Sequence, residues 1–248
     1  FAAMNGLLVL GSKPEPALPP RASYDAVACA NASGYSAATH QLPVPLFTVM
    51  SAILPAVASG RQSLRALAGL STETLYFFPR PAARRNRLKQ LLSLLSLLRM
   101  QPFYLRRVLR SVGYRYETFV ERSHDFYAGM IKELCDHDHG VLQQIQRKQP
   151  STGVTVLAIG LAEHQFDHYI LSGFSFELTH AYANNPEIAE RESNLSRHAE
   201  TDIAVMGYLA RKFSNVFTTE AVVHQRAGIP LLPALAEVGS VQRPTGKE

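Results

Sequence analysis

The sequence contains only two cysteines, Cys29 and Cys135, among 248 residues. They are far apart and lack the spacing of metal ligands, which argues against a disulfide framework or a zinc site. Cys29 lies in an apolar run and is interpreted as a core residue. So few cysteines fit a protein of a reducing, cytosolic compartment.

No stretch of the sequence is long and apolar enough to predict a transmembrane helix. The longest candidate, 46–58, is interrupted by Pro55, whereas a membrane span needs about 20 apolar residues. No signal peptide is recognised, and residues 1–3 ahead of Met4 are interpreted as an addition outside the fold. We therefore predict one large α/β domain over 4–248, long enough to bury a sizeable core.

Acidic residues are absent from 80–115, a segment that carries ten of the 25 lysines and arginines. The rest of the chain has 15 basic residues against 20 acidic ones, so this segment holds the whole excess of positive charge. A leucine-rich stretch at 88–98 and a second stretch at 103–112 predict two basic amphipathic helices. We expect a basic helical insertion or lid over 80–118.

Two interpretations of this basic segment stay open. Basic amphipathic helices can lie on an anionic membrane surface, here through 80–115, which would make the protein peripheral at the inner membrane. Alternatively, the leucines pack on the core and arginines such as Arg106, Arg107 and Arg110 face solvent. Nucleic-acid binding is not expected, because no RNA- or DNA-binding motif accompanies the arginines.

Apolar runs that end in small or polar residues predict a Rossmann-like parallel sheet flanked by helices. Strands are expected at 7–10, 26–30, 46–49, 75–78, 169–172 and 215–219, and helices at 51–60, 119–134, 154–162, 203–213 and 230–238. The first strand ends in Gly11-Ser12 and the second is followed by Asn31. Because only one glycine follows the first strand, the dinucleotide fingerprint is missing and an NAD-binding protein is not indicated.

Residue types that ligate metals cluster at Cys135-Asp136-His137-Asp138-His139. Adjacent residues cannot easily all face one ion, and the helical His-x-x-x-His spacing is absent. We therefore interpret the cluster as a polar loop or helix end, and predict no metal site.

Three motifs late in the chain point to a ligand site. Pro150-Ser151-Thr152-Gly153 before an apolar run predicts a helix cap, and free N–H groups at such a helix start suit an anion such as phosphate. The strand 169–172 is followed by Gly173-Phe174-Ser175, at the position where α/β folds place ligands. His198-Ala199-Glu200-Thr201-Asp202 begins a further helix within reach of the same crevice.

The order and spacing of these motifs resemble those of the sialyltransferases. The bacterial lipooligosaccharide type has a Thr/Ser-Gly helix start, a strand ending Leu-Ser-Gly-Ile-Asp-Phe and a helix start His-x-x-x-Thr-Asp-Ile, whereas the animal type carries Pro-Ser/Thr-Thr-Gly and Gly-Phe. The resemblance implies a GT-A-like variant of the Rossmann fold. It implies an enzyme that transfers a 2-keto-3-deoxy sugar acid, sialic acid or Kdo, from a CMP-activated donor to a glycan or glycolipid of a bacterial surface, without a metal cofactor.

The resemblance also implies roles for particular residues. His198 matches the general base of the bacterial enzymes. Tyr182 falls near one of two tyrosines that hydrogen-bond the leaving phosphate. Glu177 falls near the other, so one of these two tyrosines is missing here. The donor-binding positions match Gly11, Ser12, Asn31, Ser151, Thr152, Gly153, Gly173, Phe174 and Ser175.

Stereochemistry and catalysis leave alternatives open. Retaining Kdo transferases of related fold use an aspartate nucleophile, which we would seek where this chain has Ser175. Because a serine without a base is a poor nucleophile, inverting displacement is predicted, while Glu177 keeps a retaining mechanism open. A carboxylate, Glu200 or Asp202, could orient His198. A noncatalytic, membrane-associated protein with the same fold is a further alternative.

Overall fold

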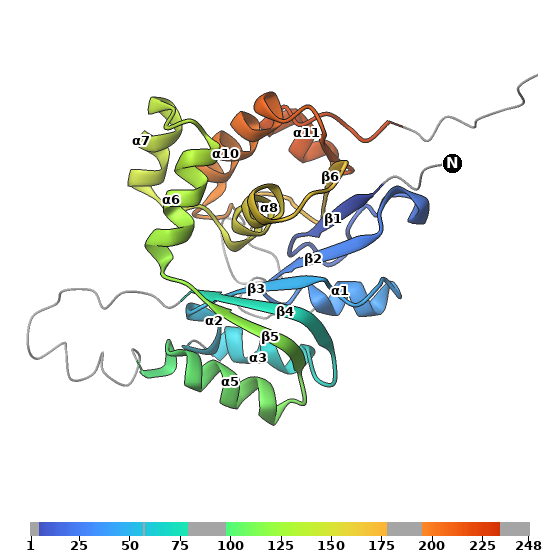
Figure 1. The fold of residues 1–248 in the computed structure, drawn as a ribbon, viewed down its shortest axis with the longest axis vertical. Helices are drawn as coiled ribbons and strands as arrows, with labels where there is room; N and C mark the ends of the chain where they lie inside the picture. The colour runs from blue at the N-terminus through green and yellow to red at the C-terminus, as the bar shows by residue number, and fades with distance from the viewer. Residues whose placement is uncertain (1–4, 57, 79–97, 178–194, 234–248) are drawn as a thin grey trace, which may run out of the picture.

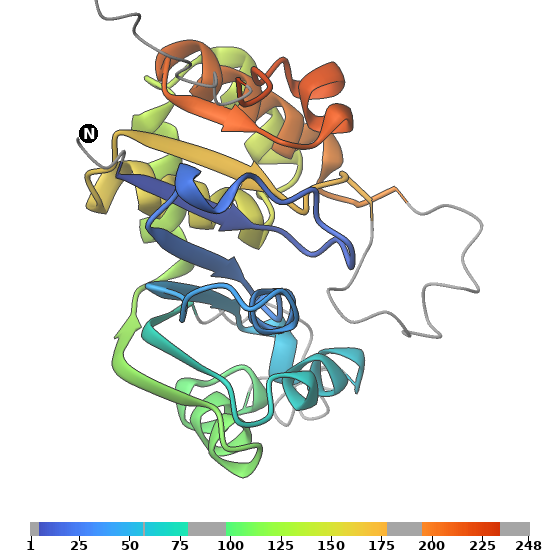
Figure 2. The same cartoon turned by 90° about the vertical axis from the view of Figure 1, so that its right-hand side faces the viewer.

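A computed structural model describes residues 5–56, 58–78, 98–177 and 195–233. Within these residues, seven parallel strands form one sheet in the order β5-β4-β3-β2-β1-β6-β7. The strands are β1 (Gly6–Leu10), β2 (Ala26–Ala30), β3 (Phe47–Ser51), β4 (Ser71–Phe78), β5 (Arg115–Glu121), β6 (His168–Ser172) and β7 (Val216–Thr218). Figure 2 shows the strand arrows stacked in this order. The predicted Rossmann-like α/β fold is confirmed.

Helices cover both faces of the sheet (Figure 1). The described ones are α1 (Gly34–Thr39), α2 (Ile53–Ala56), α3 (Ala58–Ala66), α5 (Pro102–Ser111), α6 (His124–Leu134), α7 (His139–Arg147), α8 (Thr152–Glu163), α10 (Ala199–Lys212) and α11 (Ala221–Ala227). None of the helices in the described part of the chain is long and apolar enough to cross a membrane.

Side chains of the central strands point alternately to the two faces of the sheet, so that each face has its own hydrophobic cluster. In β1, Leu7 and Val9 pack with α8, whereas Leu8 and Leu10 pack on the opposite face with Cys29 and its neighbours. Successive strand side chains point to opposite faces, and a strand buried on both faces is continuously apolar. The helix α8 is buried over most of its length because it lies across the central strands. The prediction that Cys29 is a core residue is confirmed.

The described part of the basic segment contains a crossover helix. Helix α5 connects β4 to β5 and buries Leu105 and Leu109 against the sheet, while Arg106, Arg107 and Arg110 are exposed. The predicted helix over 103–112 is thus confirmed. Most of the leucine-rich stretch, 88–97, lies outside the described residues.

One other sequence prediction is wrong, and a second is contradicted over the part of it that the structure describes. The helix expected from Phe119 begins only at His124, because 115–121 forms the edge strand β5, whose exposed polar residues hide its strand pattern. The terminal helix expected at 230–238 is absent from its described part, since Leu231 forms a parallel bridge with Thr218. Residues 234–238 lie outside the described residues, and the unpredicted helix α11 precedes this stretch.

The order of the strands creates a switch point between β1 and β6. The chain starts in the middle of the sheet at β1, builds outward to β5, and returns to add β6 on the other side of β1. Connections then leave the carboxyl ends of β1 and β6 toward different sides. In open α/β sheets this is where ligands bind.

Candidate functional site

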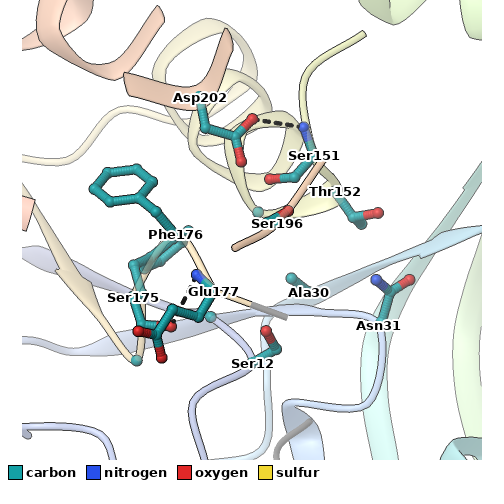
Figure 3. A pocket seen from close by; sticks show the side chains of 14 residues that line it. Ser12, Ala30, Asn31, Ser151, Thr152, Ser175, Phe176, Glu177, Ser196 and Asp202 are labelled. Carbon is teal, nitrogen blue, oxygen red and sulfur yellow. Dashed lines mark hydrogen bonds between the residues drawn. The ribbon is translucent and has the colours of Figure 1, made fainter. Parts of the chain in front are cut away.

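A pocket lies at this switch point, at the carboxyl ends of β1, β2 and β6 (Figure 3). All nine residues predicted to bind the donor line it: Gly11, Ser12, Asn31, Ser151, Thr152, Gly153, Gly173, Phe174 and Ser175. Glu177 lines it as well, together with Ala30, Phe176, Ser196 and Asp202. Tyr182, also predicted as a site residue, lies outside the described residues. The structure thus brings together segments that are far apart in the sequence.

The ends of β1 and β6 touch at the floor of the pocket. Gly11 N donates a hydrogen bond to the carbonyl of Ser172 at 2.8 Å. A Cβ atom added to Gly11 would lie only 2.3 Å from the carbonyl oxygen of Gly173. Glycine at position 11 is therefore required by the close approach of two backbones.

The helix α8 points its first turn into the pocket. Ser151 is its N-cap, and the Ser151 hydroxyl accepts from Val154 N at 3.5 Å. The predicted cap is confirmed. A helix start of this kind presents backbone N–H groups and a positive dipole end, which favour an anion.

A buried carboxyl group adjoins the same helix start. Asp202, on α10, is 6% exposed, and its Oδ1 accepts from Ser151 N at 2.8 Å. Burial raises the pKa of Asp202 to about 7, although hydrogen bonds from Ser151 oppose the rise. From the sequence, Asp202 was predicted only as a possible partner of His198. Its burial was not predicted, because the sequence does not show which carboxyl groups are removed from water.

Asn31 is held in a conformation that leaves its amide nitrogen toward the pocket. Its φ is 53°, in the left-handed region that asparagine tolerates better than most residues. Its Oδ1 accepts from Ser51 N at 3.1 Å, which ties the end of β2 to the end of β3. Because the oxygen is used in this way, the NH₂ group is the part of Asn31 that faces the pocket (Figure 3).

His198 is not among the residues that line the pocket, although it lies in the sequence between the lining residues Ser196 and Asp202. It is the N-cap residue of α10 and is half-buried. Its Nδ1 lies 2.7 Å from the carbonyl oxygen of Gln149. Since a carbonyl only accepts, Nδ1 carries the proton, and in the neutral ring Nε2 has the lone pair.

The contact that orients His198 is therefore a backbone carbonyl. The two carboxylates suggested for this task have other partners. Glu200 is exposed and lies 3.7 Å from Arg226, and Asp202 accepts from Ser151. The role of Gln149 was not predicted from the sequence, because it is the backbone carbonyl that contacts His198, and every residue type has one.

The charge of the pocket is unusual for an anion site. Among the described residues that line it, none is a lysine or an arginine, whereas Glu177 and Asp202 are acidic. An anion bound at this place would be held by backbone N–H groups and by hydroxyl and amide side chains.

Within the described ranges, no group of three or more His, Cys, Asp or Glu side chains could hold a metal ion. The cluster at 135–139 has structural partners. Asp136 pairs with Lys212 at 2.7 Å, and Asp138 caps α7 by accepting from Val141 N at 2.9 Å. The interpretation of this cluster as a loop and helix end is confirmed.

Sheet order and pocket position define an α/β protein whose candidate site occupies the usual ligand position of such folds. Several solved structures share this fold, and they are sialyltransferases. CstII from Campylobacter jejuni, in complex with the substrate analogue CMP-3FNeuAc, superimposes with a TM-score of 0.52 at 14% identity, covering 93% of this chain and 87% of that chain. The monofunctional alpha-2,3-sialyltransferase Cst-I from the same organism gives 0.52 at 13% identity, covering 93% and 81%.

CST-II in complex with a trisaccharide acceptor and CMP gives a TM-score of 0.51 at 13% identity, covering 91% of this chain and 86% of that chain. This chain therefore has a sialyltransferase-like fold, as its motifs predicted. No family model matches the sequence. Comparison with curated protein sequences also finds no match.

Proposed function

We propose that this chain is a glycosyltransferase that transfers a 2-keto-3-deoxy sugar acid from a CMP-activated donor to a glycan. The observation that carries the proposal is the meeting of nine motif residues in one pocket at the switch point of a sialyltransferase-like fold. CMP is bound in the similar structure of CST-II, which supports the same nucleotide here.

The donor carries a phosphate and a sugar carboxylate, both anionic. The start of α8, with the Ser151 and Thr152 hydroxyls, offers neutral donors to one of these groups, and the amide of Asn31 offers another. Neutral donors can bind an anion without the desolvation cost of burying a cation beside it. We propose no metal in this reaction.

His198 is the proposed general base. The acceptor hydroxyl gives its proton to Nε2 while its oxygen forms a bond to the anomeric carbon of the sugar acid. The bond from that carbon to the phosphate oxygen breaks, and CMP leaves with the electron pair. The Gln149 carbonyl, 2.7 Å from Nδ1, supports this role because it selects the tautomer with a basic Nε2.

A retaining Kdo transferase is the second candidate. It is favoured by one observation, the exposed carboxylate of Glu177 at the edge of the pocket, where it could act as a nucleophile. The anomeric configuration of the product, read by NMR, separates the two. Inversion supports direct displacement, and retention supports a covalent intermediate on a carboxylate.

The acceptor is proposed to be a bacterial cell-surface glycan or glycolipid, with the enzyme in the cytoplasm or peripheral at the inner membrane. A noncatalytic nucleotide-binding protein would bind CMP and show no turnover with any sugar acid. Turnover with a glycolipid acceptor is thus the discriminating assay.

The first experiment is thermal unfolding with CMP, UMP, GDP or NAD at equal concentration. A ligand at about 100 times its dissociation constant stabilises the folded state by about 2.7 kcal/mol, which is a readily measured shift. Stabilisation by CMP alone supports the proposal and leads to turnover assays with CMP-sialic acid and CMP-Kdo. Stabilisation by another nucleotide and not by CMP would overturn the donor assignment.

A further inference from the structure

A buried glutamate joins the two loops that form the floor of the pocket. Glu220 follows β7 and is 3% exposed. Its Oε1 accepts from Gly173 N at 2.8 Å and from Ala17 N at 2.9 Å. Its Oε2 accepts from the Lys13 ammonium at 2.7 Å. Lys13 and Glu220 are 207 residues apart in the sequence.

The partners of Glu220 belong to the pocket or adjoin it. Gly173 lines the pocket, and Lys13 directly follows the lining residues Gly11 and Ser12. Lys13 N also donates to the Gly173 carbonyl at 2.9 Å. The carboxylate therefore holds the end of β6 and the loop after β1 against one another, and it is not itself among the residues that line the pocket.

This arrangement uses a buried charge where an apolar side chain would cost less. A buried carboxylate is costly unless it is paired and hydrogen-bonded, and a buried ion pair adds little net stability. Glu220 meets that condition with three donors on two oxygens. The same contact occupies the Lys13 ammonium, so that the one lysine of the loop 11–17 is directed to Glu220 and is not among the residues that line the pocket.

We propose that Glu220 is a positioning residue, which fixes Gly173 and the loop after β1 in the arrangement that binds the donor nucleotide. This inference rests on the proposed function for its ligand. Glu220 acts through the positions of Gly173 and the loop after β1, and does not itself contact the substrate.

The two carboxylate oxygens allow the roles of Glu220 to be separated by substitution. Glu220→Ala removes the acceptor of both backbone N–H groups and the partner of Lys13. Glu220→Gln keeps a carbonyl oxygen for Gly173 N and Ala17 N, but turns an NH₂ group toward the Lys13 ammonium. The double variant Glu220→Gln/Lys13→Met keeps the acceptor and removes the unbalanced cation.

CMP affinity is measured by calorimetry for each variant. We expect Glu220→Ala to weaken binding about tenfold or more, the scale of a buried donor that loses its acceptor. The double variant should bind CMP within about threefold of the wild-type protein, well inside the loss expected of Glu220→Ala. Lys212→Met is the matched control, because it removes an ion pair of the same 2.7 Å length on α10, outside the pocket lining. It should leave CMP affinity unchanged.

Amide hydrogen exchange without ligand gives an independent readout. Peptides that contain Ala17 and Gly173 should exchange faster in Glu220→Ala and near the wild-type rate in Glu220→Gln. If wild-type protein fails to bind CMP, the proposed function fails, and these exchange rates still decide whether Glu220 holds the loops. Unchanged exchange at both peptides in Glu220→Ala, or CMP affinity equal to wild type in that variant, would overturn the proposal.

Discussion

The ring of Phe174 occupies the space in which a side chain on Gly153 would stand. A Cβ atom added to Gly153 would lie 2.5 Å from Cε1 of that ring. The glycine opens α8, and the phenylalanine follows β6, so the two motifs that pointed to a ligand site are complementary in shape.

Replacing Gly153 by alanine should disturb both folding and the pocket. The new methyl group must displace the Phe174 ring, and overpacking of this kind typically costs about 1–3 kcal/mol of unfolding free energy. Urea unfolding measures the loss. Gly129→Ala is the control, because an added Cβ there meets no atom within 4 Å, so alanine should raise helix stability by up to about 1 kcal/mol. Equal effects of the two substitutions would contradict the predicted clash.

His198→Ala should remove the proposed general base and leave the proposed nucleotide site intact. General-base catalysis typically contributes about 10²–10⁴ in rate, so turnover should fall by that factor while CMP binding stays within a few-fold of the wild-type value. His139→Ala, an exposed histidine at the start of α7, serves as the control. Wild-type turnover in the His198 variant would remove this residue from the mechanism.

Asp202 should make stability depend on pH in a specific direction. Its pKa is raised by burial to about 7 in the folded state, whereas an unfolded aspartate titrates near 4. The folded state therefore holds the proton between these values, and the stabilisation falls as pH rises from about 4 to about 7. The loss is on the order of 4 kcal/mol at 1.36 kcal/mol for each pKa unit.

Urea unfolding from pH 4 to pH 8 tests this dependence. In Asp202→Asn the amide oxygen can still accept from Ser151 N, but the group no longer titrates. The difference in unfolding free energy between wild type and variant should change across this window and level off above pH 7. A difference that stays constant from pH 4 to pH 8 would show that Asp202 titrates normally.

The membrane interpretation of the basic segment makes its own prediction. Arg107 and Arg110 are exposed on α5, while Arg106 stacks over the Phe119 ring at 4.0 Å from the centroid. Liposomes with anionic lipid should therefore sediment the wild-type protein but not Arg107→Glu/Arg110→Glu. The charge-matched control Arg65→Glu/Arg211→Glu, at exposed positions of α3 and α10, should sediment like wild type. Equal sedimentation of all three proteins would favour the alternative interpretation, in which the arginines of α5 face solvent and bind no membrane.

The central part of the fold was predictable from the sequence because its strands and helix are buried on every side. The apolar runs of β1, β2 and β6 and the capped run of α8 carry a strong pattern, and the structure reproduces them within a few residues. The edge strand β5 was missed, because none of its residues is fully buried and its exposed glutamates are equally compatible with a helix or loop. A strand is therefore easier to predict from the sequence when more of its side chains are buried.

The pocket residues were predictable as far as backbone chemistry fixes the residue type. Glycine at a close approach and serine at a helix cap have few substitutes, so Gly11, Gly153 and Ser151 stood out. Contacts between distant side chains and backbone leave no such mark. Glu220 pairs with a lysine 207 residues away, and the Gln149 carbonyl orients His198 whatever side chain residue 149 carries.

The pairing of β1 with β6 sets the order in which the chain can complete itself. Leu7 lies beside Tyr169 and Leu10 beside Ser172. Strand β1 therefore cannot pair with β6 until about 160 further residues have been synthesised. During synthesis, the edge of β1 that β6 later covers exposes unpaired backbone groups between apolar side chains, which is the kind of edge that recruits other chains. The same pairing brings the ends of β1 and β6 together at the floor of the pocket, which the later segments with Ser196, Asp202 and Glu220 then complete.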